Sequence, residues 1–483
     1  MNNVILKYLS SLGYNVSGNY YGNIETWKAW WENDVKEFHE YHDQSGVKRE
    51  LYKLGMAKRG CEDWASILYT ERDEMMCNNT KNQEYLDAQL KELKFSDIMP
   101  DNIETAFWSG TEATILRVKN AKVIGKKIVA DENTKTQLIN VNASQIIPLK
   151  VDNGEIIDVA FVSETIINQK KAYYIEIHEL GENGYTIYNK YIDENGGELQ
   201  NDEVVDEYET GTDIPLFSIL RPRILNNIED NNGLGISVYA NAIDPLKSCD
   251  LAYNNYNKDM ELGGKKVFYN KKLVKYEIRE YTNQETGETI KEEIPIYPDD
   301  LTKQQFQVLG DDVDTVNDET LIHEYNPELR IAEDEQAINL ALNIFAFKCG
   351  MGKYYRFDNG TVVTATQYIG ENKDLVSNAK KHRSAVNEYA VGIAKAILLI
   401  GRMLFNEPVT EEDEINLTDK DGFLISDEEL QDRYREDFQA GLMSKKRYLM
   451  KARGMSEEQA IKEIEEAKAD NPTVEQIIGG NNE

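Results

Sequence analysis

The chain has 483 residues, 41% hydrophobic and 29% charged, which is the composition of a folded protein and enough chain for two or three hydrophobic cores. It carries 54 basic and 86 acidic residues, a formal net charge of -32. This acidity argues against tight, salt-sensitive binding to nucleic acid, which needs clustered lysine and arginine. Contact with DNA would have to come from small basic patches.

The cysteines and the apolar segments give expectations about the compartment. Cys61, Cys77, Cys249 and Cys349 are scattered without C-x-x-C spacing, so reduced thiols and a cytoplasmic setting are favoured over a disulfide framework. Residues 1–14 predict a short amphipathic helix without a cleavage site, so no signal peptide is expected. The longest apolar run, 394–405, is too short and too interrupted to span a bilayer.

The N-terminal part predicts helices followed by a sheet. Apolar residues recur every three or four positions over 27–38 and 54–68, and the tryptophans there are expected in the core. The period then changes to two, with turn residues such as Asp152-Asn153-Gly154 between the runs, so we expect a mostly antiparallel sheet that ends near residue 230. Its strands are predicted over 111–120, 136–151, 156–167, 171–180 and 185–192.

The middle of the chain alternates between helix and strand. Helical spacing covers 236–262 and stops at Gly263-Gly264. A small β module with a hairpin turn at Thr286-Gly287 should follow, then a short polar helix over 299–308 and a strand over 321–325. Residues 330–348 are predicted to be helical again, with one apolar face.

A glycine-rich stretch, residues 349–367, separates this helix from the next. Gly350-x-Gly352 lacks the third glycine of a dinucleotide fingerprint, and Gly352-Lys353 lacks the upstream glycine of a phosphate loop, so a nucleotide cradle is disfavoured. A helix from about 364 to 405 is predicted next, roughly 60 Å long. Such a length suits an oligomeric shell or tube better than a lone globular domain.

The C-terminal part is acidic and polar. Serine followed by acidic residues predicts the starts of a pair of helices over 426–439 and 456–469, with a flexible tail beyond 470. Between them lies a basic patch: Lys445, Lys446, Arg447, Lys451 and Arg453. We expect this patch to pair with the acidic helices beside it.

No catalytic or metal-binding set emerges. His39 and His42 lack the i,i+4 spacing and further ligand of a zinc site, so a solvated helix face is favoured. Five histidines and no G-x-S-x-G motif give little support for nucleophilic catalysis. The acidic runs 311–314 and 411–414 lack the glycine and closing glutamate of a calcium loop. We expect no cofactor, no metal and no enzymatic activity.

The densest basic cluster lies in the β module, interleaved with Phe268, Tyr269 and Tyr276. Its members are Lys265, Lys266, Lys271, Lys272 and Lys275. Contact with a phosphate backbone is one interpretation. The other, equally open, is the polar face of an exposed hairpin paired with the acidic residues that follow it.

The order of the predicted segments along the chain resembles that of the portal proteins of tailed double-stranded DNA bacteriophages, in particular the type found in long-tailed phages of Gram-positive hosts. Gln367 stands where that family has an acidic residue. Four stretches carry the resemblance, within a span of roughly residues 5–465: LGMAKRGCEDWASILYTER, INVNASQIIPLKVDNGEIIDVAF, NNGLGISVYANAIDPLKSCDLAYNNYNKDMELGGKKVF and TATQYIGENKDLVSNAKKHRSAVNEYA.

The resemblance implies an α+β fold with an elongated portal-type subunit. Its parts would be a wing (helical N-terminus plus mostly antiparallel sheet), a helical stem, a small β clip, a tunnel loop, a long helix and a helical crown. The implied bounds are 1–235 for the wing, 236–262 and 330–349 for the stem, 263–329 for the clip, 350–363 for the tunnel loop, 364–405 for the long helix of the wing and 406–483 for the crown and flexible tail.

The resemblance also implies a role. Such proteins form a ring, usually of twelve subunits, at one capsid vertex, through which DNA enters during packaging and leaves during ejection. The implied partners are other copies, passing duplex DNA without sequence preference, the terminase large subunit, major capsid and scaffolding proteins, and a head–tail connector or adaptor protein, with no membrane. The implied location is the virion head–tail junction, after assembly in the host cytoplasm.

The expected tunnel-loop contacts to DNA are Lys353, Tyr354, Tyr355, Arg356, Asp358 and Asn359, and the lysines of the β module are expected to serve docking or DNA contact. Two alternatives stay open: a metal-dependent head-associated nuclease, and another ring of the head–tail connector.

Overall fold

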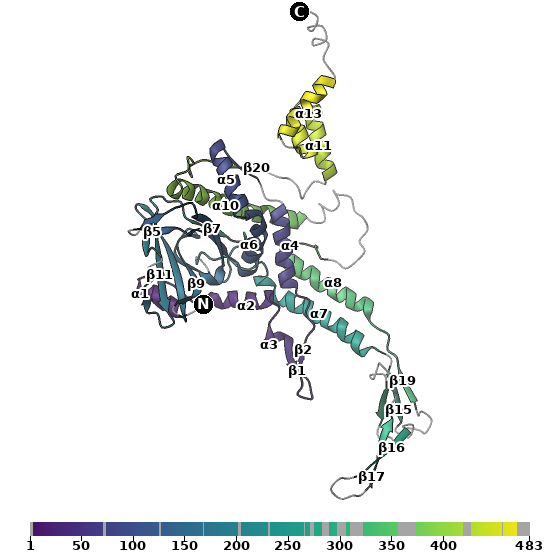
Figure 1. Cartoon of the computed structure of the whole chain (residues 1–483). Coiled ribbons are helices and arrows are strands. Elements are labelled where there is room, and N and C mark those ends of the chain that lie inside the picture. The colour runs from purple at the N-terminus through teal and green to yellow at the C-terminus, as the bar shows by residue number, and fades with distance from the viewer. Residues whose placement is uncertain are drawn as a thin grey trace, which may run out of the picture.

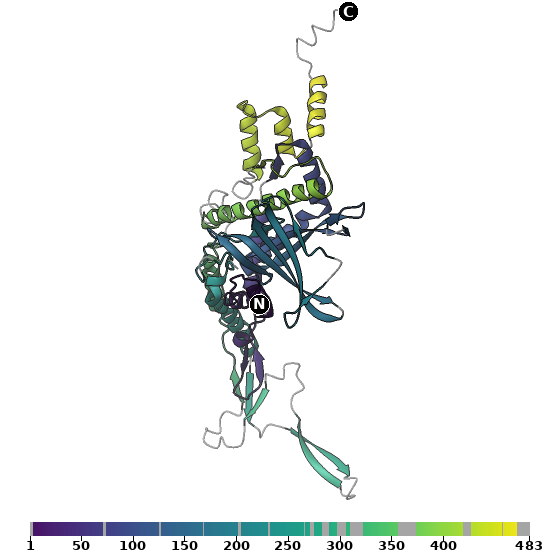
Figure 2. The ribbon, with the colours of Figure 1, turned by 90° about the vertical axis from the view of Figure 1, so that its left-hand side faces the viewer.

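The computed structural model describes residues 3–70, 74–124, 127–167, 169–200, 204–229, 232–264, 266–270, 275–282, 289–296, 306–309, 322–355, 373–418, 427–455 and 457–470. Helices make up 46% and strands 26%, and the two gather in different parts of the chain, so the fold is α+β. The molecule is elongated: a body of helices and sheets lies between a helical arm with strands at its tip and a group of C-terminal helices (Figure 1). Figure 2 shows these two projections at opposite ends.

Helices open the body. They are α1 (Asn3–Ser11), α2 (Tyr21–Trp31), α3 (Lys36–His39), α4 (Met56–Thr70), α5 (Thr80–Glu92) and α6 (Phe95–Ser109). Trp27, Trp30 and Trp64 are buried, which confirms their expected place in the core, whereas Trp31 is only half-buried. The continuous helix expected over 27–38 is wrong: Asn33 has a φ of 59°, and this left-handed residue ends α2. The chain then forms one helical turn and a hairpin, β1 (Glu40–His42) with β2 (Lys48–Glu50).

The expected antiparallel strands are present, except that the run 136–151 is divided by a short 3₁₀ turn (Ala143–Gln145) into two strands of different sheets. The larger sheet has the order β12-β11-β10-β9-β8, with β13 also paired to β11, and a second sheet has the order β14-β4-β7. Asn153 and Gly154 both have positive φ, as a two-residue hairpin between β8 and β9 requires. The strand bounds are β4 (Glu112–Lys119), β7 (Lys135–Asn142), β8 (Ile146–Asp152), β9 (Glu155–Ile167), β10 (Lys170–Gly181), β11 (Gly184–Asp193), β12 (Glu198–Leu199), β13 (Glu207–Glu209) and β14 (Phe217–Leu220), with a small hairpin of β5 (Lys122–Ile124) and β6 (Lys127–Val129).

The long helix α10 (Lys373–Leu404) completes the body from far along the chain. It packs on β14, β4, α4 and α5, and the Ser218 hydroxyl donates to the Tyr389 carbonyl at 2.9 Å. Its 32 residues span about 48 Å at 1.5 Å per residue. By length and a mean hydropathy of 1.3 over 18 residues, α10 could cross a membrane, yet 72% of that window is buried inside the body. The start of the helix predicted at 364 lies outside the described residues.

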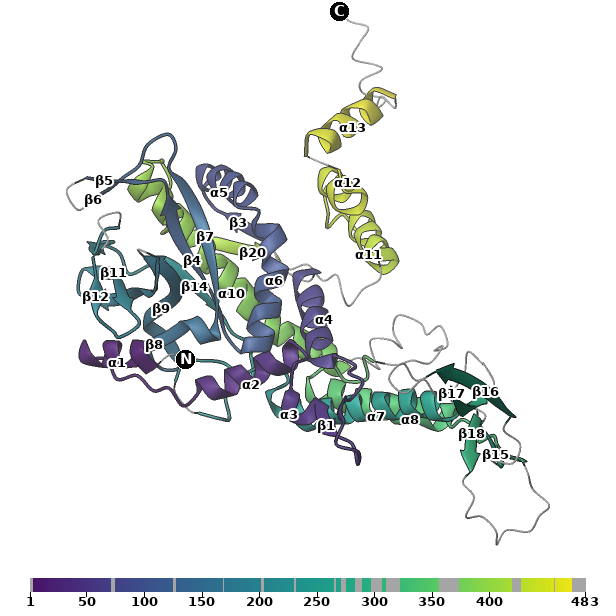
Figure 3. The same cartoon turned by 60° about the horizontal axis from the view of Figure 1, so that its bottom comes forward.

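The helical arm consists of α7 (Ile243–Leu262) and α8 (Ile331–Lys348), which lie side by side (Figure 3). α7 begins seven residues later than the predicted start at 236, after a short 3₁₀ turn (Ala240–Ala242). At the tip, β15 (Lys266–Asn270) pairs with β18 (Phe306–Leu309) in parallel and with β19 (Ile322–Tyr325) in antiparallel orientation. The helix predicted over 299–308 is therefore wrong where it covers 306–308, since this alternating segment pairs with β15 as part of a strand.

A separate hairpin, β16 (Lys275–Thr282) with β17 (Thr289–Ile296), confirms the predicted one. Its turn, with Thr286-Gly287, lies outside the described residues. We call β15 to β19 the tip strands.

The described residues of the C-terminal part form three helices where two were expected: α11 (Asp427–Gln439), α12 (Lys445–Arg453) and α13 (Glu457–Asp470). The additional helix, α12, covers the basic patch. Ser444 caps its start by accepting a hydrogen bond from the Arg447 amide at 3.3 Å, and Gly454 ends it with a φ of 64°. Before them, β20 (Ile415–Thr418) returns to the body and pairs with β3 (Glu74–Cys77).

Candidate functional site

The start of the predicted tunnel loop is anchored to the body by its backbone. Gly350 and Gly352 have φ values of 77° and 63°, which turn the chain sharply away from α8. The Gly350 carbonyl accepts a hydrogen bond from Asn378 Nδ2 at 2.9 Å, and a Cβ added at Gly350 would meet the same nitrogen at 2.9 Å. Trp64 Nε1 donates to the Cys349 carbonyl at 3.2 Å. The loop therefore starts from a fixed point between α4, α8 and α10.

Tyr355 provides a second anchor. Its hydroxyl donates to Asp63 Oδ2 at 2.6 Å, and Arg59 holds the same carboxylate through Nε at 3.0 Å and Nη2 at 2.8 Å. The Tyr355 ring stacks on Phe345 with centroids 6.2 Å apart. Burial, and then the hydrogen bond to Asp63, raise the pKa of Tyr355 far above its usual value. The phenol stays protonated and serves as a donor that holds the loop.

The predicted loop residues divide into three groups. Lys353 is exposed, Tyr354 is half-buried with its ring edge-on to Tyr355 at 5.1 Å, and Tyr355 is engaged as above. Arg356, Asp358 and Asn359 lie outside the described residues. Contact of any of these with DNA stays a prediction. Among the predicted loop residues that the structure describes, Lys353 has a charged side chain exposed to solvent.

The lysines of the β module are placed only by their backbone. Lys266 belongs to β15 and Lys275 begins β16, whereas Lys265, Lys271 and Lys272 lie outside the described residues. The neighbouring side chains of the β16–β17 hairpin are largely exposed. The exposed apolar ones are Tyr276, Ile278, Tyr281 and Ile290. Because an isolated two-stranded hairpin is marginally stable in water, this surface is suited to a partner.

The helical arm carries the most prominent uncovered apolar surface. On α8, Leu340, Ile344 and Phe347 are 63%, 45% and 67% exposed, and their i, i+4, i+7 spacing places them on one face. On α7, Leu251 and Leu262 are 43% and 61% exposed. We call these five side chains the arm stripe. Single exposed leucines are ordinary, whereas an apolar row along a projecting helix marks a contact surface.

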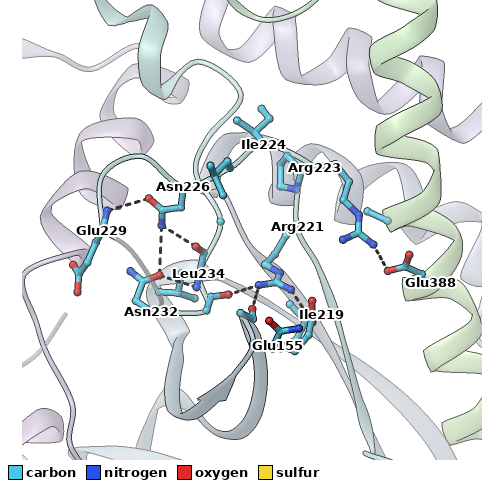
Figure 4. Close-up of a pocket in the computed structure, with 17 residues that line it drawn as sticks. Glu155, Ile219, Arg221, Arg223, Ile224, Asn226, Glu229, Asn232, Leu234 and Glu388 are labelled. Carbon is cyan, nitrogen blue, oxygen red and sulfur yellow. Dashed lines mark hydrogen bonds and ion pairs between the residues drawn. The ribbon is translucent and has the colours of Figure 1, made fainter.

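A cavity of about 410 Å³ lies between the β8–β9 turn, the end of β14, residues 224–229 and 232–235, and α10 (Figure 4). Arg221 donates to the carbonyls of Gly154 and Gly233, at 2.7 Å each, and to Glu155 at 2.8 Å. Arg223 is paired with Glu388. Both guanidinium groups are thus neutralised by carboxylates of the same chain, so the cavity is poorly suited to a phosphate group.

Two buried polar clusters brace the body. Glu176 bonds to His178 Nε2 at 2.8 Å and to Arg117 Nη2 at 2.5 Å. Burial opposes ionisation of Glu176, yet the His178 hydrogen bond and the Arg117 charge hold its pKa below the usual value.

In the second cluster Thr114 Oγ1 lies 3.0 Å from Glu112 Oε1 and 2.5 Å from the Tyr389 hydroxyl. Burial raises the pKa of Glu112 well above its usual range. The contact between Thr114 and Tyr389 there joins β4 to α10.

His39 corrects one sequence prediction. It is buried rather than on a solvated helix face, and its Nε2 lies 2.9 Å from Asp250 Oδ2 on α7. His42 lies in β1, so the two histidines do not share a helix. In the part of the chain that the structure describes, no group of three or more histidine, cysteine, aspartate or glutamate side chains could hold a metal ion.

The partners of the loop were not accessible to sequence reasoning. Asp63 and Tyr355 are 292 positions apart, and Asn378 acts through an amide that no motif distinguishes. Neither a family model nor a curated protein matches the chain.

Proposed function

We propose that this protein is a non-enzymatic, ring-forming portal subunit that conducts DNA through a capsid vertex and provides a docking platform for the packaging motor and later for connector proteins. In this assignment the body is the wing, the helical arm is the stem, the tip strands are the clip and α11 to α13 belong to the crown. The ordered resemblance of the four sequence stretches supplies the family.

The observation that carries the proposal is the arm stripe. A two-helix arm that projects from the body with Leu340, Ile344 and Phe347 in water is incomplete as a monomer. In a ring, each arm would lie against the arms of two neighbouring copies and remove this apolar surface from solvent. The exposed hairpin β16–β17 would be available for pairing at the outer end of the stem.

The charge fits a conduit. A net charge of -32 lowers adhesion between the walls and DNA, so a strand can pass without being held. Lys353, at the anchored start of the loop, is then a candidate for weak contact that does not depend on base sequence. The twelvefold ring, the terminase and the capsid partners are parts of the same proposal.

Imaging of the purified full chain tests the proposal. We expect closed rings in negative stain and a matching oligomer mass in mass photometry. A chain that stays monomeric or dimeric at high concentration and in capsid-like buffer would contradict a ring.

A double substitution in the arm stripe sharpens this test. Leu340→Glu with Phe347→Glu should abolish rings while the far-UV circular dichroism of the monomer is kept, because both side chains are already exposed. The matched control is Leu225→Glu, since Leu225 is 86% exposed but lies on the body. If the control disrupts rings and the stripe variant does not, the assignment of the arm as the ring-forming stem is wrong.

A further inference from the structure

α12 has a charge opposite to that of the rest of the protein. Five of its nine residues, KKRYLMKAR, are lysine or arginine and none is acidic, whereas the whole chain has a net charge of -32. The five basic side chains are all exposed, and no residue of α12 is buried. The helix thus presents a concentrated cationic surface on an anionic molecule.

The helices on either side of α12 are predominantly acidic. α11 and α13 each contain six acidic and two basic residues. α12 lies between them in the chain and contacts both, and its Tyr448 ring stacks on Phe438 of α11 with centroids 4.9 Å apart. Among the acidic side chains described, Asp432, Glu436, Glu463, Glu465 and Glu466 are exposed. The C-terminal helices therefore carry both signs, segregated by helix.

Four of the five basic side chains of α12 are not neutralised by the described carboxylates. Among the described side chains, no carboxylate lies within 4.0 Å of the cationic group of Lys445, Arg447, Lys451 or Arg453. Lys451 instead lies over the Tyr434 ring, 5.9 Å from its centroid. The pairing expected from the sequence stays a prediction for these four residues, because the side chains of Asp427, Glu428, Glu429, Glu457 and Glu458 lie outside the described ones.

Two ion pairs of α11 and α13 each lie within a single helix. Arg435 pairs with Asp432 at 3.1 Å and Lys462 with Glu466 at 3.7 Å. Exposed acidic and basic side chains of this region thus lie on neighbouring helices and face solvent.

We propose that α12 docks onto the exposed carboxylates of α11 and α13 of a second copy of this chain. A contact between two different surfaces of identical subunits is head-to-tail, and such contacts close into a ring when the rotation allows it. Complementary charges at such a contact set its register and its association rate more than its strength. The inference deepens the proposed function, on which it rests for the closed ring, by assigning a surface that sets how neighbouring crowns align.

Duplex DNA is the less suitable occupant. A phosphate backbone that approached α12 would also come within about 10 Å, one Debye length at 0.1 M salt, of the acidic helices beside it. A neighbouring copy instead offers a carboxylate surface to α12 and a cationic surface to α11 and α13, so both signs are matched in one contact.

A charge-swap experiment on the full chain tests the contact. One variant carries Arg447→Glu and Lys451→Glu, a second carries Glu463→Lys and Glu465→Lys, and a third carries all four changes. For the first two we expect the concentration at half-assembly to rise about tenfold at 0.1 M salt, the scale of one or two lost ion pairs per contact. The effect should shrink at 1 M salt, and the third variant should return close to the wild type because the two signs are exchanged.

The matched control is Lys7→Glu with Lys91→Glu, which makes the same charge change at exposed lysines of the body. Two results would overturn the inference: charge variants that assemble like this control, or a third variant that is not restored. Loss of binding to a 30-base-pair duplex with assembly unchanged would make α12 a DNA surface and overturn it as well.

Sedimentation of the wild type at low and high salt separates this inference from the ring. Salt-sensitive dimers or open chains without closed rings would support the contact and contradict the ring. Rings that ignore all charge changes would contradict the contact alone, and a chain that is monomeric in every buffer would contradict both.

Discussion

The body and the helical arm differ in how far their large apolar side chains are buried. In the body, Trp64, Phe107 and Tyr389 are almost fully buried. In the arm, Leu262, Leu340 and Phe347 are more than 60% exposed. The body end of the arm still shares the core, since Phe345 of α8 is fully buried. The transition from a closed to an open surface thus occurs within one helix.

This difference separates two tasks. A closed core makes the body stable by itself, because burial of apolar surface is the dominant favourable contribution to folding. An arm with an open stripe gains that contribution only when another surface covers it. The substitutions below use this contrast, and they are ordered from the largest expected effect to the smallest.

Trp64→Ala should produce the largest loss. Trp64 is fully buried between α6 and α10 and donates to the Cys349 carbonyl, so its removal leaves a cavity and should lower the free energy of unfolding by about 3 to 5 kcal/mol. Phe347→Ala is the matched change in the arm and should cost less than about 0.5 kcal/mol in the monomer. Urea unfolding below the assembly concentration measures both. Equal losses of unfolding free energy in the two variants would contradict the contrast between a closed body and an open arm.

Acid should destabilise the body through His382. Burial, and then the neighbouring Lys381, lower the pKa of His382 to about 4, and its Nδ1 accepts a hydrogen bond from the Arg223 amide at 3.1 Å. The unfolded imidazole has the ordinary pKa near 6.5, so the unfolded state takes up the proton first. The stabilising contribution is present above pH 6.5 and is lost as the pH falls towards 4, by about 3 kcal/mol in total.

Two asparagine variants test whether His382 causes this dependence of stability on pH. His382→Asn should flatten the dependence of the unfolding free energy on pH between 7 and 4, whereas His42→Asn, at an exposed position in β1, should keep it. If the His382→Asn variant keeps the wild-type dependence of the unfolding free energy on pH, other titratable groups are responsible for that dependence.

Tyr355→Phe should have a smaller and local effect. It removes the hydroxyl that donates to Asp63 but keeps the ring on Phe345, so the cost should be about 1 kcal/mol, that of one hydrogen bond to a charged group still held by Arg59. Hydrogen exchange at the amides of 351–355 should accelerate, while exchange in β9 and β10 stays unchanged. Unchanged exchange at the loop would mean that Gly350 and Asn378 are sufficient to hold it.

Arg330→Lys should have the smallest effect. Arg330 bonds to both oxygens of Asp259 at 2.9 Å where the arm meets the tip strands, but its side chain is 66% exposed. Ion pairs in such surroundings contribute little. The unfolding free energy should stay within experimental error. A clear loss would show that the far end of the arm is more tightly ordered than its exposure indicates.

Local patterns were sufficient for much of the fold. The strands β9, β10 and β11 follow from alternating β-branched and aromatic residues between turns, and α7 and α8 follow from periodicity of three to four residues. β18 was missed because its pairing partner lies some forty residues earlier in the chain, and partners outweigh propensity in short segments. The break after Trp31 depends on one left-handed asparagine, Asn33, which no periodicity reveals.

The candidate surfaces were predictable only in part. The glycines of the loop and the basic residues of α12 were apparent in the sequence, because composition marks them. The burial of His39 depends on Asp250, 211 positions away, and the anchoring of Tyr355 depends on Asp63. Contacts at such separations leave no local periodic trace.

The place of α10 in the body has a consequence for synthesis of the chain. Tyr389 on α10 meets Thr114 on β4, and the two are 275 residues apart. At 5 to 20 residues per second, a ribosome needs on the order of ten to sixty seconds to cover that distance. During this interval the arm has emerged while the body lacks its closing helix. A nascent chain would thus expose the arm stripe before the body can close around α10.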